Sequence, residues 1–383
     1  MKKTILFLLL AVMSSALRAE GKFSLLTCAP GEKIYELFGH TAIRYVEGDS
    51  IDLVFNYGMF NFNSPNFIYR FVKGETDYEL GIDVYRSFEY SYRRRGSAVY
   101  EQKLNLTPDE TIMLLHSLLE NYKPENRVYR YNYFYDNCTT RAKDMIEKAI
   151  SGTVEFEPIE GRKTYRSIVH QYTAGHPWSE LGIDLCIGSQ ADKPIDTDAM
   201  MFAPFYLLDG LKTAGITRDD GSEESLISGT EMIVSPAHVD NGAVSWPHPL
   251  LCAWVMFAIA LVAGFFLRRK SWIVDSILFL MAGACGCVLA FLVLFSVHPA
   301  VSPNYLLFVF HPLHLFLGVP MTVYCGLKKT RPYYHYFNAS LIGLFLILWL
   351  FLPQEFNNAV FPLALLLLLR SVSAIYCFRK NVR

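Results

Sequence analysis

The sequence predicts an exported α+β domain followed by an α-helical membrane domain of five transmembrane helices. Residues 249–383 carry ten Lys or Arg but only two Asp or Glu, a formal charge of +8, whereas residues 1–248 carry −9. The last third also holds five long apolar segments, and the first two thirds alternate between strand-like and helix-like patterns. At 52% apolar and 19% charged residues, the chain departs from soluble domains, which average ~45–50% and ~25%. A wholly soluble protein is therefore excluded.

The first 19 residues have the features of a secretory signal peptide. Lys2 and Lys3 precede an apolar run at 5–13, and small residues follow up to Ala19. Nine apolar residues are too few to cross the ~30 Å hydrocarbon core of a bilayer. We therefore expect export with cleavage near residue 19; an uncleaved anchor is the alternative.

Residues 20–212 are predicted to form the exported domain, with a polar connector over 213–248. Residues 39–46 alternate with period two, a turn cluster occupies 47–50, and residues 51–57 resume the pattern, which predicts a β-hairpin. Folding this hairpin about its turn places Asn56 and Tyr57 beside His40. Further strands are expected at 77–85 and 99–106, and Thr107, Pro108 and Glu110 predict a capped helix start.

Residues 131–146 contain the strongest candidate for a reactive group. An aromatic stretch runs into Asp136 and Asn137, which are favoured N-cap types, so a helix is expected from Cys138 through about Ala149. A thiol in the first turn is favoured as the thiolate by the helix dipole, and the free N–H groups there can hold an oxyanion. His40, at a strand start, is the natural base. The alternatives are a structural core histidine and a buried or disulfide-bonded cysteine.

Five of the eight cysteines lie in the apolar segments, so Cys28, Cys138 and Cys186 are the three in the exported region. This odd number leaves at least one thiol unpaired in a monomer. No Cys or His spacing resembles a metal site, and we predict none. The pair His311 and His314 is expected to serve packing.

The apolar segments at 250–267, 273–297, 305–327, 339–353 and 359–378 predict five spans. Basic clusters follow the first, third and fifth, while the two alternate loops contain no Lys or Arg. By the positive-inside rule this makes a multi-pass membrane protein with an exported N-terminal domain and a cytoplasmic C-terminus. Asp275 is expected at the interface, and Arg370 either snorkels to the interface or holds a lipid phosphate.

Several segments are distinctive as a set: 27–32 (TCAPGE), 38–44 (FGHTAIR), 55–58 (FNYG) and 131–141 (YNYFYDNCTTR), followed by Trp178, 182–185, Gly188 and 302–304. Together they resemble the Lnb family of Bacteroidota-type lipoprotein N-acyltransferases. The resemblance implies a multi-pass protein of the bacterial inner membrane with its catalytic domain in the periplasm. The order of a strand histidine before a cysteine at a helix start is also similar to circularly permuted papain-like (NlpC/P60-type) thiol enzymes.

The resemblance implies acyl transfer through a thioester, without a cofactor. It implies that Cys138 is the nucleophile and His40 the general base and acid. Asn56 is expected to orient His40, with Tyr57 as the second choice for that role. Residues of the same motifs that are expected to support the site or its oxyanion are Asn137, Asp136, Arg141 and Arg44.

The implied partners are a phospholipid acyl donor, an apolipoprotein acceptor and the membrane itself, with no nucleic acid. The acyl chain would pass to the α-amine of a diacylglyceryl-cysteine. Two other functions fit the same residues: a membrane-tethered cysteine endopeptidase or amidase that acts on cell-wall peptides, and a non-catalytic lipoprotein or envelope assembly factor. The size of the membrane part weighs against the endopeptidase, which needs no site for an acyl chain.

Overall fold

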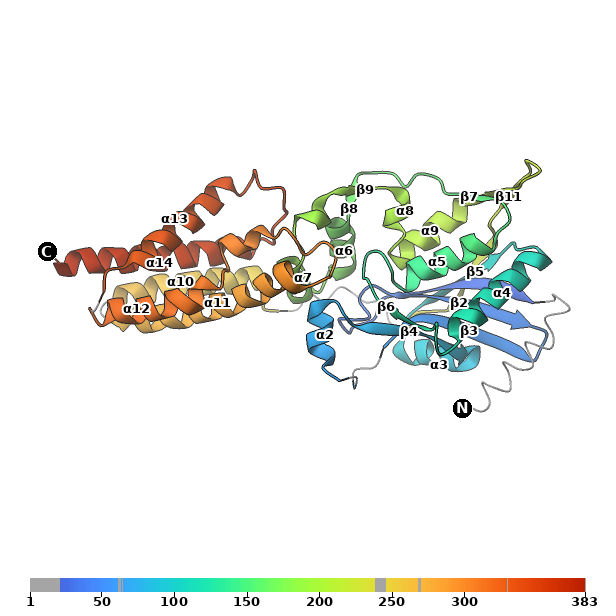
Figure 1. Ribbon diagram of the computed structural model, residues 1–383, viewed down its shortest axis with the longest axis horizontal. Helices are drawn as coiled ribbons and strands as arrows, with labels where there is room; N and C mark the ends of the chain where they lie inside the picture. Colours follow the sequence, from blue (N-terminus) through green and yellow to red (C-terminus); the bar gives the residue numbers. More distant parts are fainter. Residues whose placement is uncertain are drawn as a thin grey trace. The chain divides into compact units, whose positions relative to one another are not determined.

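The computed structural model describes residues 21–60, 63, 65–237, 246–267, 270–328 and 330–382, and the predicted signal peptide lies outside them. The chain divides into two compact units (Figure 1). The first unit contains the described residues up to Tyr172 and those from Pro194 to Ala237. The second contains Thr173–Lys193 and the described residues from Trp246 onward.

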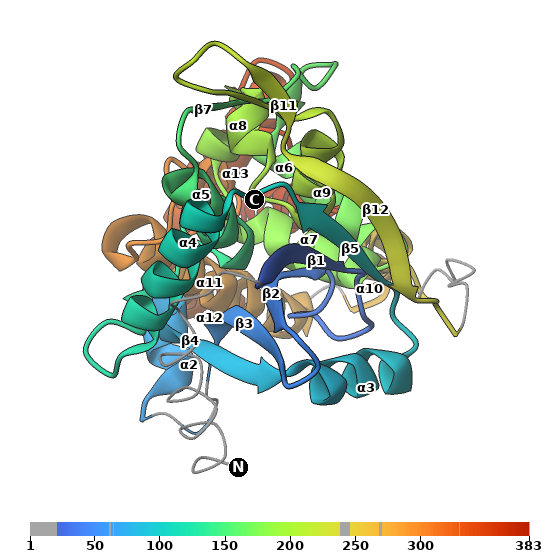
Figure 2. The ribbon, with the colours of Figure 1, turned by 90° about the vertical axis from the view of Figure 1, so that its right-hand side faces the viewer.

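A seven-stranded sheet forms the frame of the first unit (Figure 2). Every neighbouring pair in it is antiparallel. In spatial order the strands are β12 (Ile227–Val234), β5 (Val99–Leu104), β1 (Lys22–Cys28), β2 (His40–Glu47), β3 (Ile51–Met59), β4 (Asp77–Val84) and β6 (Val128–Arg130).

Both faces of this sheet are covered. On one face Leu25, Ile43 and Phe55 are buried beneath α4 (Pro108–Tyr122) and α5 (Cys138–Ala149). On the other, residues such as Leu26 and Val54 pack against α3 (Tyr85–Arg95) through its residues Phe88 and Tyr92. Figure 2 shows α3 on the side of the sheet opposite α4 and α5. The strands are apolar at most positions because both sets of side chains are buried.

Local sequence signals account for the elements that place the site. The predicted hairpin is confirmed as β2 and β3, with Val46 opposite Asp52. The predicted capping box of α4 is confirmed too: the Thr107 side chain accepts a hydrogen bond from the Glu110 amide, and the Glu110 carboxylate accepts one from the Thr107 amide. These reciprocal bonds satisfy amides that have no partner inside the helix.

The region predicted as a connector, 213–248, is largely folded where it is described. Its strands β10 (Gly215–Thr217) and β11 (Glu223–Ser225) form a small sheet with β7 (Thr153–Glu155). β12 follows as an edge strand of the main sheet, paired with β5. Only its ends, Ile227 and Val234, are buried. An edge strand that exposes its middle has the polar composition of a linker, which explains the prediction.

Within the predicted domain 20–212, the segment Thr173–Lys193 packs as part of the second unit. This segment carries α7 (Pro177–Cys186) and a 3₁₀ turn, η1 (Ser189–Asp192). The remaining elements of the first unit are α2 (Phe67–Lys73), β8 (Lys163–Thr164), α6 (Tyr165–Thr173), β9 (Pro194–Ile195), α8 (Thr197–Met200) and α9 (Pro204–Thr213).

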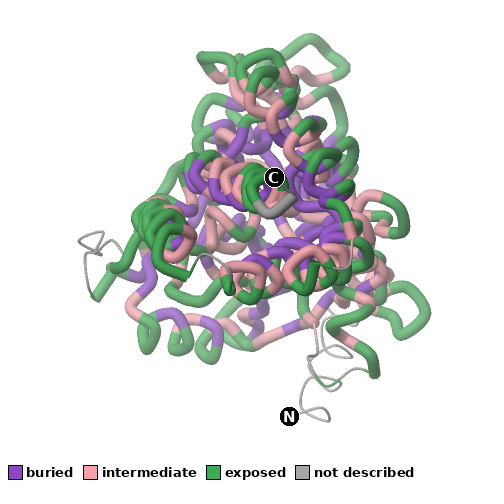
Figure 3. The backbone as a smooth tube through the Cα atoms, turned by 90° about the vertical axis from the view of Figure 1, so that its left-hand side faces the viewer, coloured by how far each residue is buried: buried purple, intermediate pink, exposed green. Residues whose placement is uncertain are grey.

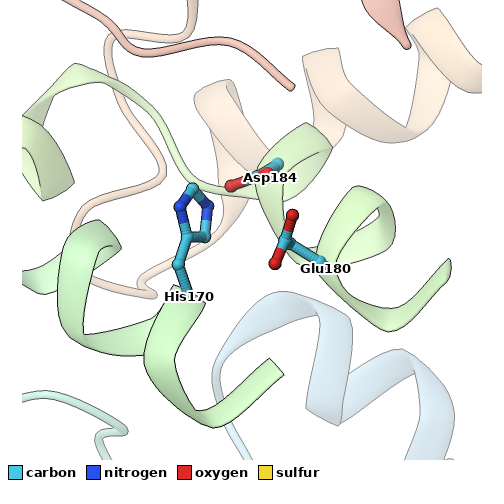
Figure 4. A group of neighbouring side chains, drawn as sticks. All are labelled: His170, Glu180 and Asp184. Atoms are coloured by element: carbon cyan, nitrogen blue, oxygen red, sulfur yellow. The ribbon is translucent and has the colours of Figure 1, made fainter. Parts of the chain in front are cut away.

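Hydrogen bonds within the second unit hold α7. Glu180 and Asp184 project from consecutive turns of this helix, and His170, drawn with them, comes from α6 (Figure 4). Thr173 donates to the Glu180 carboxylate (3.1 Å), and the Asn357 amide donates to that of Asp184 (3.0 Å). Both carboxylates therefore serve the structure of this unit.

Three helices of the second unit are long and apolar enough to cross a membrane: α10 (Pro249–Leu267), α11 (Ser271–Phe295) and α14 (Val360–Val382). Two apolar helices are shorter, His314–Gly326 and α13 (Tyr333–Leu348). Only 11% of the residues in the most apolar window of α10 are buried. Figure 3 colours the backbone by burial, and the helical turns at its periphery are largely exposed. The five predicted spans thus correspond to three long helices and two short ones among the described residues.

The third predicted span, 305–327, is helical only in part. It begins with a 3₁₀ turn, η3 (Tyr305–Phe308), and becomes continuous at a π-helical turn, η4 (His314–Gly318), which leads into α12 (Val319–Gly326). Pro312 lacks an N–H and disfavours helical geometry in the residue before it, which explains the late start.

The two charges in the predicted spans pair with each other, contrary to the sequence interpretation. Asp275 was expected at the interface, and Arg370 was expected either to snorkel to the interface or to hold a lipid phosphate. Both are instead buried, at 2% and 1% exposure, and joined by a hydrogen-bonded ion pair. Arg370 Nη1 also donates to the Ala260 carbonyl (2.9 Å), and Gly264 leaves room for that nitrogen. Pairing satisfies charges that are costly to bury alone.

Candidate active site

Cys138 is the first residue of α5, and its position is fixed by the cap before it. The side-chain oxygen of Asn137 accepts hydrogen bonds from the amides of Thr139 (2.7 Å) and Thr140 (2.9 Å). The side-chain nitrogen Nδ2 of Asn137 donates in turn to the backbone carbonyls of Tyr133 and Phe202. The predicted N-cap is confirmed, and it anchors the start of the helix to two separate loops.

His40 and Asn56 are brought together at one end of the β2–β3 hairpin. His40 Nε2 lies 3.1 Å from Asn56 Oδ1, and Asn56 is 2% exposed. The Asn56 amide nitrogen donates to Oδ2 of Asp83, on the neighbouring strand β4, at 3.0 Å. Three strands thus contribute one residue each to a hydrogen-bonded row.

This row determines which nitrogen of His40 is available. Asp83 Oδ2 accepts a hydrogen bond from the NH₂ of Asn56, which holds the Asn56 oxygen toward His40. His40 must then donate from Nε2, which leaves Nδ1 as the nitrogen that can take or give a proton on the side of Cys138. The tautomer required of a general base is therefore imposed from Asp83.

The electrostatics favour an ion pair between Cys138 and His40. Burial disfavours the thiolate, but the His40 charge, its hydrogen bond and the Thr41 amide together lower the pKa of Cys138. Burial likewise disfavours the imidazolium, but the Cys138 sulfur and the hydrogen bonds from both neighbours raise the pKa of His40. Burial also raises the pKa of Asp83, against the opposing effects of His40 and Asn56. A lowered thiol pKa beside a raised imidazole pKa is typical of an activated cysteine nucleophile.

The sequence suggested that the amides of the first turn are free to hold an oxyanion, but two of them are not. Those of Thr139 and Thr140 are taken by Asn137. The amide of Cys138 itself makes no hydrogen bond to any described residue, and it lies at the positive end of the α5 dipole. It is the amide of this turn best placed to stabilise an oxyanion.

Gly58 keeps the space beside the thiol open. Its φ is +84°, a conformation that other residues adopt at a cost. A Cβ atom built on Gly58 would lie 3.5 Å from Cβ of Cys138 and 3.6 Å from the ring of Tyr131. A side chain at this position would therefore occupy the approach to Cys138.

The other four predicted residues lie apart from the row. Tyr57 is buried in the core, with its hydroxyl bonded to Asn121 (3.0 Å). Arg141 and Asp136 form a bidentate pair, and the Arg141 guanidinium lies 3.6 Å from the centre of the Tyr129 ring. Arg44 pairs with Asp52 and Glu101. These residues hold the strands and the loop before Cys138 in place.

All eight cysteines are free thiols, so Cys28 and Cys186 are not joined. Cys28 lies directly opposite His40 in the β1–β2 pairing and is fully buried. Burial raises the pKa of the Cys28 thiol to about 12, which keeps it protonated and unreactive. Cys138 is the cysteine of this region with a lowered pKa.

A cavity of about 370 Å³ occurs elsewhere in the first unit. It is lined by Ile159, Gln171, Tyr172, Phe205, Tyr206 and Asp209. The ring of Tyr172 contacts that of Phe38, which precedes Gly39 and His40 in the chain. One residue of the cavity wall therefore contacts the segment that leads to His40.

Comparison with known families agrees with this division of the chain. Residues 19–171 match the family model of the Lnb N-terminal periplasmic domain, and residues 241–381 match that of the Lnb transmembrane domain. The chain belongs to the Lnb family. Searches of curated proteins and of solved structures find no match. The chain is accordingly a membrane protein with a periplasmic portion, and family membership suggests a role in lipoprotein processing.

Two residues of the site, Asp83 and Gly58, are not among those predicted from the sequence. Asp83 falls in the strand expected at 77–85, but nothing in the sequence indicates which strand neighbours β3. Gly58 directly follows Asn56 and Tyr57 in the recognised FNYG segment. A glycine at the end of a predicted strand was a usable signal for a close approach.

Proposed function

We propose that the protein is a lipoprotein N-acyltransferase that works through a thioester on Cys138. It moves a fatty acyl chain from a phospholipid to the α-amine of a diacylglyceryl-cysteine apolipoprotein. The observation that carries the proposal is the row from Cys138 through His40 and Asn56 to Asp83, in a member of the Lnb family with apolar helices that can cross a membrane. The periplasmic face of the inner membrane is the proposed place of reaction.

The arrangement supports a comparison with permuted papain-like thiol enzymes. In both, a cysteine at a helix start meets a histidine on a strand of an antiparallel sheet. Here these residues are Cys138 on α5 and His40 on β2. A side-chain amide, Asn56, accepts from the other imidazole nitrogen. The likeness concerns the arrangement of groups, since the same constellation recurs on unrelated folds.

In the first step the Cys138 thiolate attacks the ester carbonyl of the phospholipid and forms a carbon–sulfur bond. The negative charge moves to the carbonyl oxygen, toward the free amide of Cys138. As the intermediate collapses, the ester carbon–oxygen bond breaks. His40 gives its Nδ1 proton to the departing alkoxide, so a lysophospholipid leaves and His40 becomes neutral.

In the second step the α-amine of the apolipoprotein attacks the thioester carbonyl. Neutral His40 takes a proton from the attacking nitrogen, the carbon–sulfur bond breaks, and an amide forms as the thiolate is restored. The ion pair present at the start is therefore recovered. A covalent intermediate allows donor and acceptor to use the site in turn, and no cofactor is needed.

The decisive experiment is mass spectrometry of the full-length protein after incubation with phospholipid vesicles. We expect a hydroxylamine-labile acyl adduct on Cys138 that disappears when a diacylglyceryl-cysteine peptide is added. Cys138→Ser should carry no such adduct and should not support lipoprotein N-acylation in cells. An unmodified Cys138 together with an active Cys138→Ser protein would overturn the proposal.

The endopeptidase or amidase remains the second candidate, because a thiolate beside an imidazolium also attacks peptide carbonyls. Incubation with cell-wall peptides separates the two. Peptide cleavage without an adduct from lipid would support the endopeptidase. Absence of both the adduct and peptide cleavage, with a Cys138→Ser protein that still functions in cells, would support the assembly factor.

A further inference from the structure

A group of exposed apolar side chains lies on α2 and on the loop before β2. We call it the α2 patch: Ile34, Tyr35, Ile68, Tyr69 and Phe71. Their exposure ranges from 49% for Tyr35 and Phe71 to 77% for Ile68. No residue of α2 is buried. A helix with no buried side chain contributes little to the core, so its apolar composition needs another explanation.

Aromatic rings connect this patch to the nucleophile. Phe71 stacks on Phe67 (6.1 Å between ring centres), and Phe67 stacks on Phe60 (6.0 Å). Phe60 contacts Tyr78 (5.1 Å), which stacks on Tyr131 at 4.1 Å.

Tyr131 ends this series at the thiol. Its ring and Cβ of Cys138 both lie within 3.6 Å of the position that a Cβ of Gly58 would take. The rings therefore form a continuous apolar series from an exposed helix to the point where the acyl group must react. Tyr35 joins it from the side through Phe60 (6.0 Å).

Basic side chains at the margin of the patch take part in ion pairs. Arg70 and Lys73 in the last turn of α2 pair with Asp77 and Glu75, and the exposed Lys33, beside the Tyr35 ring, lies 3.8 Å from Glu36. Exposed aromatic and aliphatic side chains with Lys and Arg at their margin are typical of surfaces that enter the headgroup region of a bilayer. The same chain supplies the membrane helices, and at most 14 residues separate β12 from α10. A bilayer is therefore always within reach of the first unit.

We propose that the α2 patch enters the membrane surface and that the fatty acyl chain of the donor phospholipid passes from it along Phe60, Tyr78 and Tyr131 to Cys138. This inference rests on the proposed function and adds to it the face through which the donor arrives. A chain of apolar rings lowers the cost of moving an acyl chain out of the bilayer, because the chain stays in contact with apolar surface. The polar ester then meets the thiolate beside Gly58.

The test compares two acyl donors on the full-length protein in phosphatidylethanolamine vesicles. Ile68→Glu should slow formation of the Cys138 thioester from the bilayer phospholipid about tenfold, the effect expected from losing partial burial of one isoleucine. With water-soluble p-nitrophenyl butyrate it should react at the wild-type rate. Met113→Glu, at an exposed position of α4, is the matched control and should be normal with both donors.

Equal rates for Ile68→Glu and wild type with bilayer phospholipid would overturn the inference while leaving the proposed function intact. If the wild type forms no thioester with either donor, the proposed function fails, and the patch is tested separately. A benzoylphenylalanine placed at residue 68 should crosslink to phospholipid on irradiation. Crosslinks to protein alone would show that the patch binds a polypeptide and would also overturn the inference.

Discussion

The hydrogen bonds from His40 through Asn56 to Asp83 lead to a quantitative prediction about the tautomer of His40. In Asp83→Ala the Asn56 amide loses its 3.0 Å bond to a carboxylate, and its remaining acceptor, the Val54 carbonyl, lies at 3.5 Å. A hydrogen bond to a charged group contributes about 1.5–3 kcal/mol. Without it, Asn56 can turn its NH₂ toward His40, which stabilises the tautomer with the proton on Nδ1, the wrong one for a general base.

Since about 1.4 kcal/mol corresponds to a factor of ten, Asp83→Ala should slow thioester formation about 10- to 100-fold. Asp83→Asn keeps an oxygen acceptor for Asn56 and should retain most of the rate. The assay is single-turnover acylation of Cys138 followed by mass spectrometry, with thermal unfolding measured in parallel. A normal rate in a stably folded Asp83→Ala protein would refute the reasoning. Equal impairment of both variants would show that the charge of Asp83 matters, not the orientation that it imposes.

Three further predictions concern the thiol and the membrane unit. Because the pKa of Cys138 is lowered, alkylation of the wild type by iodoacetamide should begin at a lower pH than for an ordinary thiol. His40→Ala should move the onset of alkylation to higher pH. An unchanged pH profile in this variant would argue against the ion pair. Gly58→Ala should reduce acylation from phospholipid while leaving iodoacetamide reactivity nearly unchanged, because the larger acyl ester needs the space beside Cys138; proportional loss of both would indicate a folding defect. Asp275→Ala leaves a buried Arg370 unpaired and should destabilise the protein by about 3 kcal/mol in thermal or denaturant unfolding. The double variant Asp275→Leu/Arg370→Met should recover most of that loss, and failure to recover would show that the pair has a role besides mutual compensation.

The sequence predicted the parts of the site that depend on local signals. The turn at 47–50 sets the hairpin register, and with it the meeting of His40 and Asn56. Asn137 is recognisable as an N-cap because its side chain bonds to amides only two and three residues ahead. Contacts of this kind follow from residue type and spacing.

Contacts between distant segments could not be predicted in this way. Asp83 reaches Asn56 only because β4 lies next to β3 in the sheet. Arg370 and Asp275 are 95 residues apart, and hydropathy alone treats each as an isolated charge in an apolar segment. The edge strand β12 could not be recognised from its composition, because only its two end residues are buried.

The interrupted third span has a consequence for how the membrane unit is made. Its polar groups depend on residues synthesised later: the Tyr305 amide donates to Gln354 (2.8 Å), His311 bonds to Asn338 (3.3 Å), and His314 bonds to the Tyr334 hydroxyl (2.6 Å). Backbone outside a regular helix is tolerated in hydrocarbon only where protein surrounds it. We therefore expect the segment to become stably enclosed in the bilayer only after α13 and the loop before α14 have been synthesised.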